Sequence, residues 1–369
     1  MAALSTDNKS AVDAIARLVP ATLRALHALE FAARHLAPDT LSRLVDALAG
    51  RDDGLAAALA TSRSLAWPER LGPVRECLEN AAEAVADGVA GLRAAGDSPQ
   101  PLPAAYRALR AYARAAEALY PMSAHLKPVS HFFLEPAARS DSALADRLAA
   151  ADATRDEVGV VHLGGPAGAR GVFSLYVPEY YDAARAWPLV VAMHGGSGNG
   201  GAFLWSWVRE ARSRGLVVLA PTAIGSTWSL MEPEVDGPNI DRMVDHVAGH
   251  WNIDSKRALL TGMSDGGTFT YVLGLRAGCR FTHLAPVAAS FHPMLTAFAD
   301  AGRVRGLPIH IVHGARDWMF PAEMARDARD ALEGEGALVV HREIEDLAHT
   351  YPRDANAGIL DWFLATAGA

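Results

Sequence analysis

Residues 257–275 read RALLTGMSDGGTFTYVLGL, and they carry the clearest indication of the fold that we expect for the second half of the chain. Its apolar start is typical of a buried strand, and its end is typical of a helix. Between them lies GMSDG (262–266), a G-x-S-x-G pattern. A serine in such a strand–turn–helix adopts a strained conformation that lifts its hydroxyl above the sheet, and the flanking glycines let strand and helix approach each other. The pattern predicts Ser264 as a nucleophile, with a glycine-rich turn and an incidental serine as the alternative.

Short apolar and β-branched runs alternate with helical patterns on both sides of this stretch. Strands are expected at 158–163, 171–177, 189–193, 216–220, 258–262, 284–289, 309–312 and 338–342. Helices are expected at 201–214, 239–250, 266–276, 322–333 and 355–367. The last six strands are near-continuous apolar runs, as in a parallel sheet buried on both faces, whereas a glycine-rich connection favours an antiparallel first pair. The order predicts an α/β fold with a doubly wound, mostly parallel sheet.

Residues 1–122 have a different pattern, which favours an N-terminal all-helical bundle. Apolar residues recur there at spacings of three and four, as on one face of a helix. The clearest stripes are Leu23/Leu26/Leu29/Ala33/Leu36, Val74/Leu78/Ala81/Val85/Val89/Leu92 and Tyr106/Leu109/Ala113/Ala116/Tyr120. Proline and glycine clusters separate them, so four to six antiparallel helices are expected. We interpret this bundle as a cap or a homodimer contact, with an inert extension as the alternative. Residues 123–157 are interpreted as a linker to a catalytic domain over 158–369.

The composition excludes several classes of function. The 369 residues include 34 Lys or Arg and 42 Asp or Glu, which gives a formal net charge of −8 and no basic stripe for nucleic acid. The two cysteines, Cys77 and Cys279, form neither a disulfide framework nor a zinc motif. No apolar run reaches the ~18 residues of a membrane span, and the N-terminus lacks the apolar core of a signal peptide. We therefore expect a cytoplasmic protein without a membrane span or a metal site.

A second glycine-rich loop, HGGSGNG (194–200), follows the strand expected at 189–193. Loops of this kind let the backbone approach a substrate and hold N–H groups at a tetrahedral oxyanion. The expected donors are the N–H of Gly196 or Ser197, together with the N–H of Asp265, the residue after the nucleophile. The spacing matches neither common phosphate-binding pattern, so a phosphate loop is not favoured. For the Asp265 side chain we expect no chemical role. Its negative charge at the start of the helix interacts favourably with the helix dipole.

A serine nucleophile needs a base, and the base needs an orienting carboxylate. In folds built around such a turn, the acid follows the serine in the chain and the histidine follows the acid. Asp317 comes directly after the strand at 309–312, and His349 follows the strand at 338–342, so both lie where α/β sheets place functional residues. The rival bases are His283, His292 and His313, and the rival acids are Glu345 and Asp346.

Large apolar side chains occur in the loops expected at the same edge of the sheet. An apolar pocket for a substrate needs such groups, although ordinary packing is the alternative for each of them. The candidates for the pocket are Trp228, Phe291, Trp318 and Met319.

Together these motifs resemble the α/β-hydrolase superfamily. The nearest likeness is to bacterial serine esterases of the phospholipase/carboxylesterase, polyhydroxybutyrate-depolymerase-like and feruloyl-esterase-like groups, and WNIDSKR (251–257) also looks like theirs. The resemblance covers about 158–369 and does not extend to 1–120. It implies a Ser-His-Asp acyl-enzyme mechanism, with Ser264, Asp317 and His349 as the triad, and no cofactor or metal.

The expected activity is hydrolysis of a small-molecule carboxylic ester. Acyl transfer, thioester cleavage and peptide cleavage use the same triad, so the sequence leaves the acceptor and the leaving group open. A catalytically silent binding protein on the same fold is the alternative from another class, and a complete triad argues against it.

Overall fold

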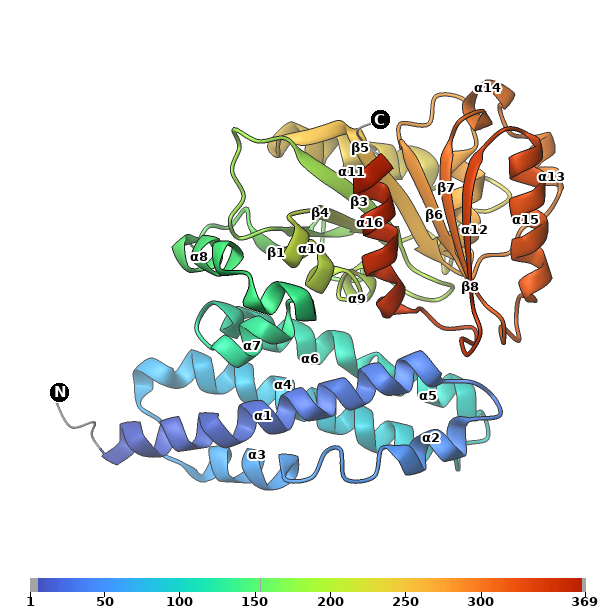
Figure 1. The fold of residues 1–369 in the computed structure, drawn as a ribbon. Coiled ribbons are helices and arrows are strands. Elements are labelled where there is room, and N and C mark those ends of the chain that lie inside the picture. Colours follow the sequence, from blue (N-terminus) through green and yellow to red (C-terminus); the bar gives the residue numbers. More distant parts are fainter. Residues whose placement is uncertain (1–5, 153, 367–369) are drawn as a thin grey trace. The chain divides into compact units, whose positions relative to one another are not determined.

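The computed structural model describes residues 6–152 and 154–366, which form two units, Met1–Asp141 and Ser142–Ala369 (Figure 1). The first unit is helical and the second is an α/β unit. The segment 123–157, for which the sequence predicts a linker, is largely helical and is divided between the two units at Asp141.

The helical unit buries most residues of the first two predicted stripes, whereas only Ala116 of the third stripe is buried, because one helix ends at Leu109 and the next begins at Ala111. Its elements are α1 (Thr6–His35), α2 (Leu41–Ala47), α3 (Leu55–Ser64), η1 (Glu69–Leu71), α4 (Gly72–Ala95), α5 (Pro101–Leu109), α6 (Ala111–Leu119), η2 (Tyr120–Ala124), α7 (Lys127–Phe132) and η3 (Pro136–Ser140). Leu26 and Leu29 of α1 and Val85 and Val89 of α4 are almost fully buried, as amphipathic helices require. At Gly88 a Cβ atom would lie 2.6 Å from the Cβ of Ala111, so α4 and α6 approach closely there.

The α/β unit contains one eight-stranded sheet in the order β1-β2-β4-β3-β5-β6-β7-β8. The strands are β1 (Gly159–Leu163), β2 (Phe173–Val177), β3 (Trp187–Met193), β4 (Val217–Pro221), β5 (Ile253–Met263), β6 (His283–Val287), β7 (Pro308–Gly314) and β8 (Leu338–Ile344). β2 is antiparallel to both β1 and β4, and β3 to β8 are mutually parallel. The predicted fold class, including the antiparallel first pair, is confirmed.

Helices cover both faces of this sheet (Figure 1). The helices of this unit are α8 (Ser142–Ala150), α9 (Gly200–Leu204), α10 (Val208–Arg214), α11 (Gly237–His250), α12 (Asp265–Gly274), α13 (Met294–Ala297), α14 (Ala301–Val304), α15 (Ala322–Gly334), η4 (Arg353–Ala355) and α16 (Asn356–Thr366). Those that pack on the strands are α9, α10, α11, α12, α15 and α16. Residues of α11, α12 and α15 share one apolar cluster with alternate residues of the strands. On the other face, α16 packs Trp362 against His283 and His310. The single helix predicted at 201–214 is two helices, α9 and α10, and the sequence did not predict α13 or α14.

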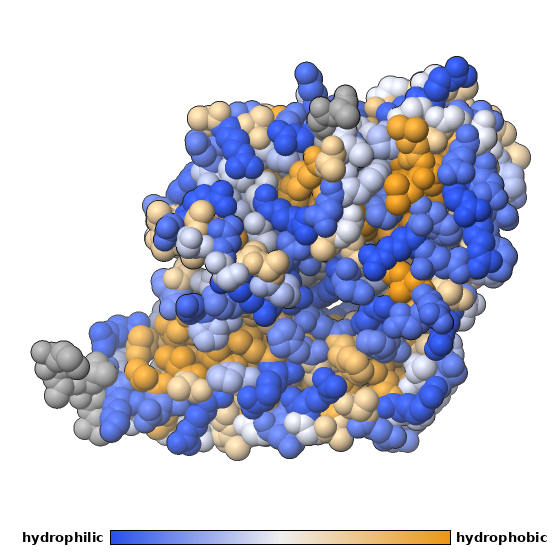
Figure 2. All heavy atoms as spheres, viewed as in Figure 1, coloured by the Kyte–Doolittle hydropathy of each residue, from blue (hydrophilic) through white to orange (hydrophobic). Residues whose placement is uncertain are grey.

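β8 forms one edge of the sheet. Its side chains Leu338 and Val340 are exposed, and Figure 2 shows an apolar strip over the strands beside α16. Of the helices in the described part of the chain, none has both the length and the apolar character that crossing a bilayer requires. The parallel strands all end at one edge, and the loops that follow β3, β4, β5, β6, β7 and β8 carry the residues predicted for the site.

Candidate active site

Ser264 lies at the sharp turn between β5 and α12. Its φ is 55° and its ψ is −118°, a conformation that is strained for any residue other than glycine. A Cβ atom on Gly262 would lie 2.4 Å from the carbonyl of Gly266, and one on Gly266 would lie 2.5 Å from the carbonyl oxygen of Met193. Both contacts are with backbone, which cannot rotate away. The two glycines are therefore what permits β5, the turn and α12 to come this close.

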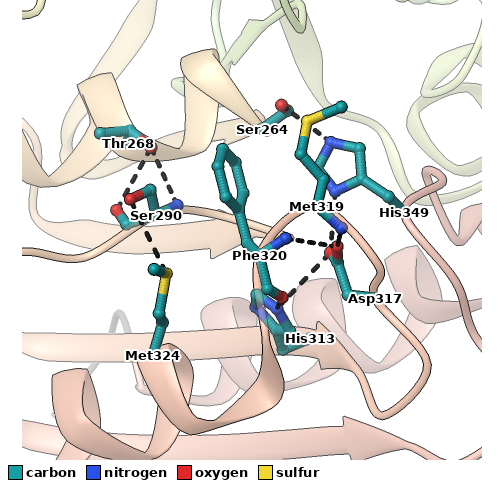
Figure 3. Close-up of polar contacts among 9 residues, drawn as sticks. All are labelled: Ser264, Thr268, Ser290, His313, Asp317, Met319, Phe320, Met324 and His349. Atoms are coloured by element: carbon teal, nitrogen blue, oxygen red, sulfur yellow. Dashed lines mark hydrogen bonds and ion pairs between the residues drawn. The ribbon is translucent and has the colours of Figure 1, made fainter.

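Three buried side chains form a hydrogen-bonded chain at this turn (Figure 3). His349 Nε2 lies 3.0 Å from Ser264 Oγ, and His349 Nδ1 lies 2.8 Å from Asp317 Oδ2. Because a carboxylate only accepts, Nδ1 carries the proton and Nε2 is left to accept the proton of the serine hydroxyl. The residues come from the loops after β5, β7 and β8, so the fold brings together groups that are 53 and 32 positions apart in the sequence.

The carboxylate of Asp317 is fixed by its own turn. Its Oδ1 accepts the backbone N–H groups of Met319, at 2.9 Å, and Phe320, at 2.8 Å. The Nε2 of His313 donates to the carbonyl of Phe320, at 2.8 Å, and lies 3.5 Å from Asp317 Oδ2. This turn leaves Oδ2 directed at His349 (Figure 3).

The structure places Asp317 and Ser264, and not the rival residues, at the two ring nitrogens of His349. His283 lies at the start of β6, at the opposite edge of the sheet. His292 is exposed and accepts the N–H of Met294 at 3.1 Å. Glu345 and Asp346 are exposed, while Asp317 is the carboxylate at His349 Nδ1.

The predicted oxyanion donors lie in the loop after β3 and at the start of α12. The N–H of Ser197 donates to the carbonyl of Ser226 at 3.1 Å, so it is not directed at a substrate. Within residues 6–152 and 154–366, the N–H groups of Gly196 and Asp265 meet no backbone acceptor. Asp265 is the first residue of α12, where N–H groups point out of the helix and the helix dipole favours negative charge. Gly196 and Asp265 are thus the remaining candidates for the donor pair.

His194 holds the loop after β3 in place. Its Nε2 accepts the N–H of Ala223 at 3.1 Å, so its Nδ1 carries the proton and donates to the carbonyl of Gly195 at 2.7 Å. Burial lowers the pKa of His194 to about 4, which keeps the ring neutral in this arrangement at neutral pH.

The four predicted pocket residues fall into two groups. Trp318 and Met319 are 43% and 45% exposed, and the Trp318 ring lies 6.1 Å from that of His349. Trp228 is buried, donates its indole N–H to the carbonyl of His194 at 2.7 Å, and stacks on Phe269. It therefore supports the loop and presents no face to a substrate.

Phe291 and Phe320 complete the apolar surroundings in different ways. Phe291 is buried, and its ring packs edge-on against that of Tyr271. It is therefore not exposed as the predicted wall of a substrate pocket would be. Phe320, which the sequence analysis did not select, places its ring 5.2 Å from that of His349 at a right angle. Its position three residues after Asp317, in the turn that binds the carboxylate, is the signal that would have identified it.

Comparisons with known proteins add likenesses to esterases. No family model matches the chain. It is 30% identical over 148 residues to the bifunctional acetylxylan esterase/xylanase XynS20E of Neocallimastix patriciarum, a match that covers 39% of this chain and 21% of that protein. A thermostable esterase of known structure is 22% identical, with a TM-score of 0.45 over 53% of this chain and 58% of its own. The acetyl xylan esterase from Aspergillus awamori is 14% identical, with a TM-score of 0.46 over 56% of this chain and 98% of its own.

This chain thus spans about a fifth of the length of the curated relative, and its structural likenesses are remote. The described residues contain no group of three or more side chains suited to hold a metal ion. The fold itself is identified by the strand order, the antiparallel second strand and the turn that carries Ser264. The unit Ser142–Ala369 thus has the α/β-hydrolase fold.

Proposed function

We propose that the chain hydrolyses carboxylic esters through an acyl-enzyme intermediate on Ser264. The observation that carries the proposal is the pair of hydrogen bonds from His349, to Ser264 Oγ at 3.0 Å and to Asp317 Oδ2 at 2.8 Å. Ser264 Oγ attacks the ester carbonyl while His349 Nε2 takes its proton and then gives it to the leaving alcohol. Asp317 holds the imidazole in the required tautomer and stabilises the imidazolium. Water, activated by His349, then releases the acid.

The negative charge that develops on the carbonyl oxygen falls, in this proposal, between the N–H groups of Gly196 and Asp265. These two N–H groups form the proposed oxyanion hole. It lies at the N-terminus of α12, where the helix dipole adds to the two hydrogen bonds. Removal of one such donor typically lowers kcat by about 10²–10³.

We further propose that the substrate places an apolar or aromatic group on Trp318 and Met319. These two side chains are exposed and belong to the turn that carries Asp317 (Figure 3 labels Met319). XynS20E is named as an acetylxylan esterase, so acetyl esters are the first acyl group to test, with alcohol parts of increasing apolar size.

The test is hydrolysis of 4-nitrophenyl acetate by the full chain and by its Ser264→Ala variant. We expect turnover by the full chain and a loss of at least about 10³-fold in the variant, with unchanged circular dichroism. Comparable turnover by the two proteins would contradict the assignment of Ser264.

A further inference from the structure

One short segment, 223–228, contacts the loop after β3 at several points. The N–H of Ala223 binds His194 Nε2, and the indole N–H of Trp228 binds the carbonyl of His194. The carbonyl of Ser226 accepts the N–H of Ser197, a residue whose φ of 57° is strained for a non-glycine. Such a conformation persists only when its surroundings hold it, so this segment determines where the N–H of Gly196 points.

The same segment also binds the other side of the oxyanion hole. The hydroxyl of Thr227 donates a short hydrogen bond to Oδ2 of Asp265, 38 residues further along the chain. Asp265 is the first residue of α12 and supplies the second proposed N–H donor. Thr227 thus links the support of one donor to the residue that carries the other.

The contact at Gly196 shows how close these groups are. A Cβ atom added to Gly196 would lie 2.7 Å from Asp265 Oδ2 and 3.9 Å from Thr227 Oγ1. The backbone of the first donor therefore packs directly against the carboxylate that Thr227 holds. A shift of that carboxylate changes the space in which Gly196 sits.

The segment is itself anchored from behind. Asp236, which is 1% exposed, accepts the N–H of Ile224 and the N–H of Ser229, both at 2.9 Å. A buried carboxylate with two N–H donors makes a rigid support, because leaving it unpaired is costly. The loop after β4 is therefore held in place, and from it the Thr227 hydroxyl reaches the first residue of α12.

We propose that Thr227 and the side chain of Asp265 are a positioning pair that sets the spacing of the two oxyanion donors. This inference rests on the proposed esterase function and assigns the Asp265 carboxylate a role that its N–H alone does not explain. Oxyanion donors act only when they lie about 2.7–3.1 Å from the developing charge. Loss of the pair leaves both N–H groups present but lets their spacing relax, which weakens transition-state binding more than substrate binding.

The experiment compares Thr227→Val, which removes the hydroxyl at constant shape, with Thr227→Ser, which keeps it. Thr282→Val is the control, because the Thr282 hydroxyl also donates a hydrogen bond, in this case to the carbonyl of Ala258, but the residue precedes β6 at the opposite edge of the sheet. In the full chain we measure kcat and KM for 4-nitrophenyl acetate, the rate of labelling by a fluorophosphonate, and the midpoint of thermal unfolding.

We expect Thr227→Val to lower kcat and the labelling rate together by about tenfold or more, with KM within about twofold. Thr227→Ser should stay within about threefold of the parent, and Thr282→Val should keep the parent rates even if it unfolds earlier. Asp265→Ala should act like Thr227→Val, and the double variant should be no slower than the slower single one, because the two changes break the same link. Asp265→Ala also serves as the test if Thr227→Val does not fold.

Parent-like kcat and labelling in folded Thr227→Val, or multiplicative losses in the double variant, would overturn the positioning role. A parent chain that neither turns over esters nor is labelled would instead refute the proposed function, and the inference with it. The two failures are distinguishable, because only the second affects the parent protein.

Discussion

The two units of this chain bury different kinds of side chain. In the helical unit the core is mostly Ala, Leu and Val on amphipathic helices, and the buried polar residues among those described are Thr22, Ser62 and Ser123. In the α/β unit the buried residues include Ser264, Asp317, His349 and several further polar side chains. Burial of polar groups is costly unless each finds a partner, so a fold retains them where they serve a purpose. Buried, hydrogen-bonded polar side chains therefore point to a chemical role for the α/β unit, whereas the apolar core of the helical unit indicates only stability.

The largest effect should come from Asp317→Asn. The side chain keeps its size, but its amide group replaces a carboxylate oxygen, so His349 loses the partner that fixes its tautomer. We expect kcat for 4-nitrophenyl acetate to fall by about 10³–10⁴-fold, with an unchanged circular dichroism spectrum. A loss of less than tenfold would show that the buried polar chain is structural and would remove the contrast between the units.

Acid should destabilise the α/β unit through its buried histidines. Burial lowers the pKa of His194, His283 and His310 to about 4, whereas unfolded histidine titrates near 6.5. Between these values the unfolded chain binds more protons than the folded one. The neutral histidines therefore contribute their full stabilisation of the folded state above about pH 6.5. As the pH falls towards 4 this contribution is lost, and the free energy of unfolding decreases by a few kcal/mol in total.

Tryptophan fluorescence during urea unfolding measures this loss, because all tryptophans except Trp67 lie in the α/β unit. His310→Leu is the matched variant, since neither ring nitrogen of His310 has a hydrogen-bond partner among the described residues. It should reduce the dependence of stability on pH. A free energy of unfolding that is constant from pH 7 to 4.5 would contradict this account of the histidines.

A smaller effect is expected from a change in the helical core. Gly88→Ala places a methyl group 2.6 Å from the Cβ of Ala111, so α4 and α6 must move apart. We expect a loss of about 1–3 kcal/mol of stability, with kcat per folded molecule unchanged. Thermal unfolding followed by helical circular dichroism measures the loss. A large fall in kcat of the folded variant would instead give the helical unit a part in the chemistry.

The smallest effect should come from Trp318→Ala. The exposed ring lies beside His349 and contributes apolar contact surface without taking part in the hydrogen-bonded chain. We expect kcat/KM for aromatic esters to fall by about tenfold relative to methyl acetate. Equal losses on both substrates would mean that Trp318 supports the Asp317 turn and does not contact the ester.

Much of the α/β unit was predictable from the sequence, for identifiable reasons. The spacing of apolar residues along the sequence shows which side of a strand or helix is buried. Gly262 and Gly266 mark a turn in which any larger residue would collide with the backbone. The acid and the histidine were then predicted from the chain order that this type of turn leads one to expect, and from their positions after two later strands. The geometry now places Ser264, Asp317 and His349 in one hydrogen-bonded chain, while their catalytic roles remain proposals.

Other features depend on contacts that leave no periodic signal. Trp228 and Trp318 are both tryptophans in loops at one sheet edge, yet one is buried under His194 and the other is exposed. The hydrogen bond from Thr227 to Asp265 joins residues that are far apart in the chain, and the sequence around a loop threonine does not indicate which residue its hydroxyl will bind. The break between α9 and α10 likewise depends on tertiary packing, because 201–214 has a continuous helical pattern.

The central claim is that Ser264 is the one nucleophile that the buried triad activates. The most direct measurement is to treat the full chain with a fluorophosphonate and to locate the adduct by peptide mass spectrometry. We expect one adduct per chain, on Ser264, and no adduct in the Ser264→Ala and His349→Ala variants. An unlabelled folded chain, or an adduct on another residue that persists in Ser264→Ala, would contradict it.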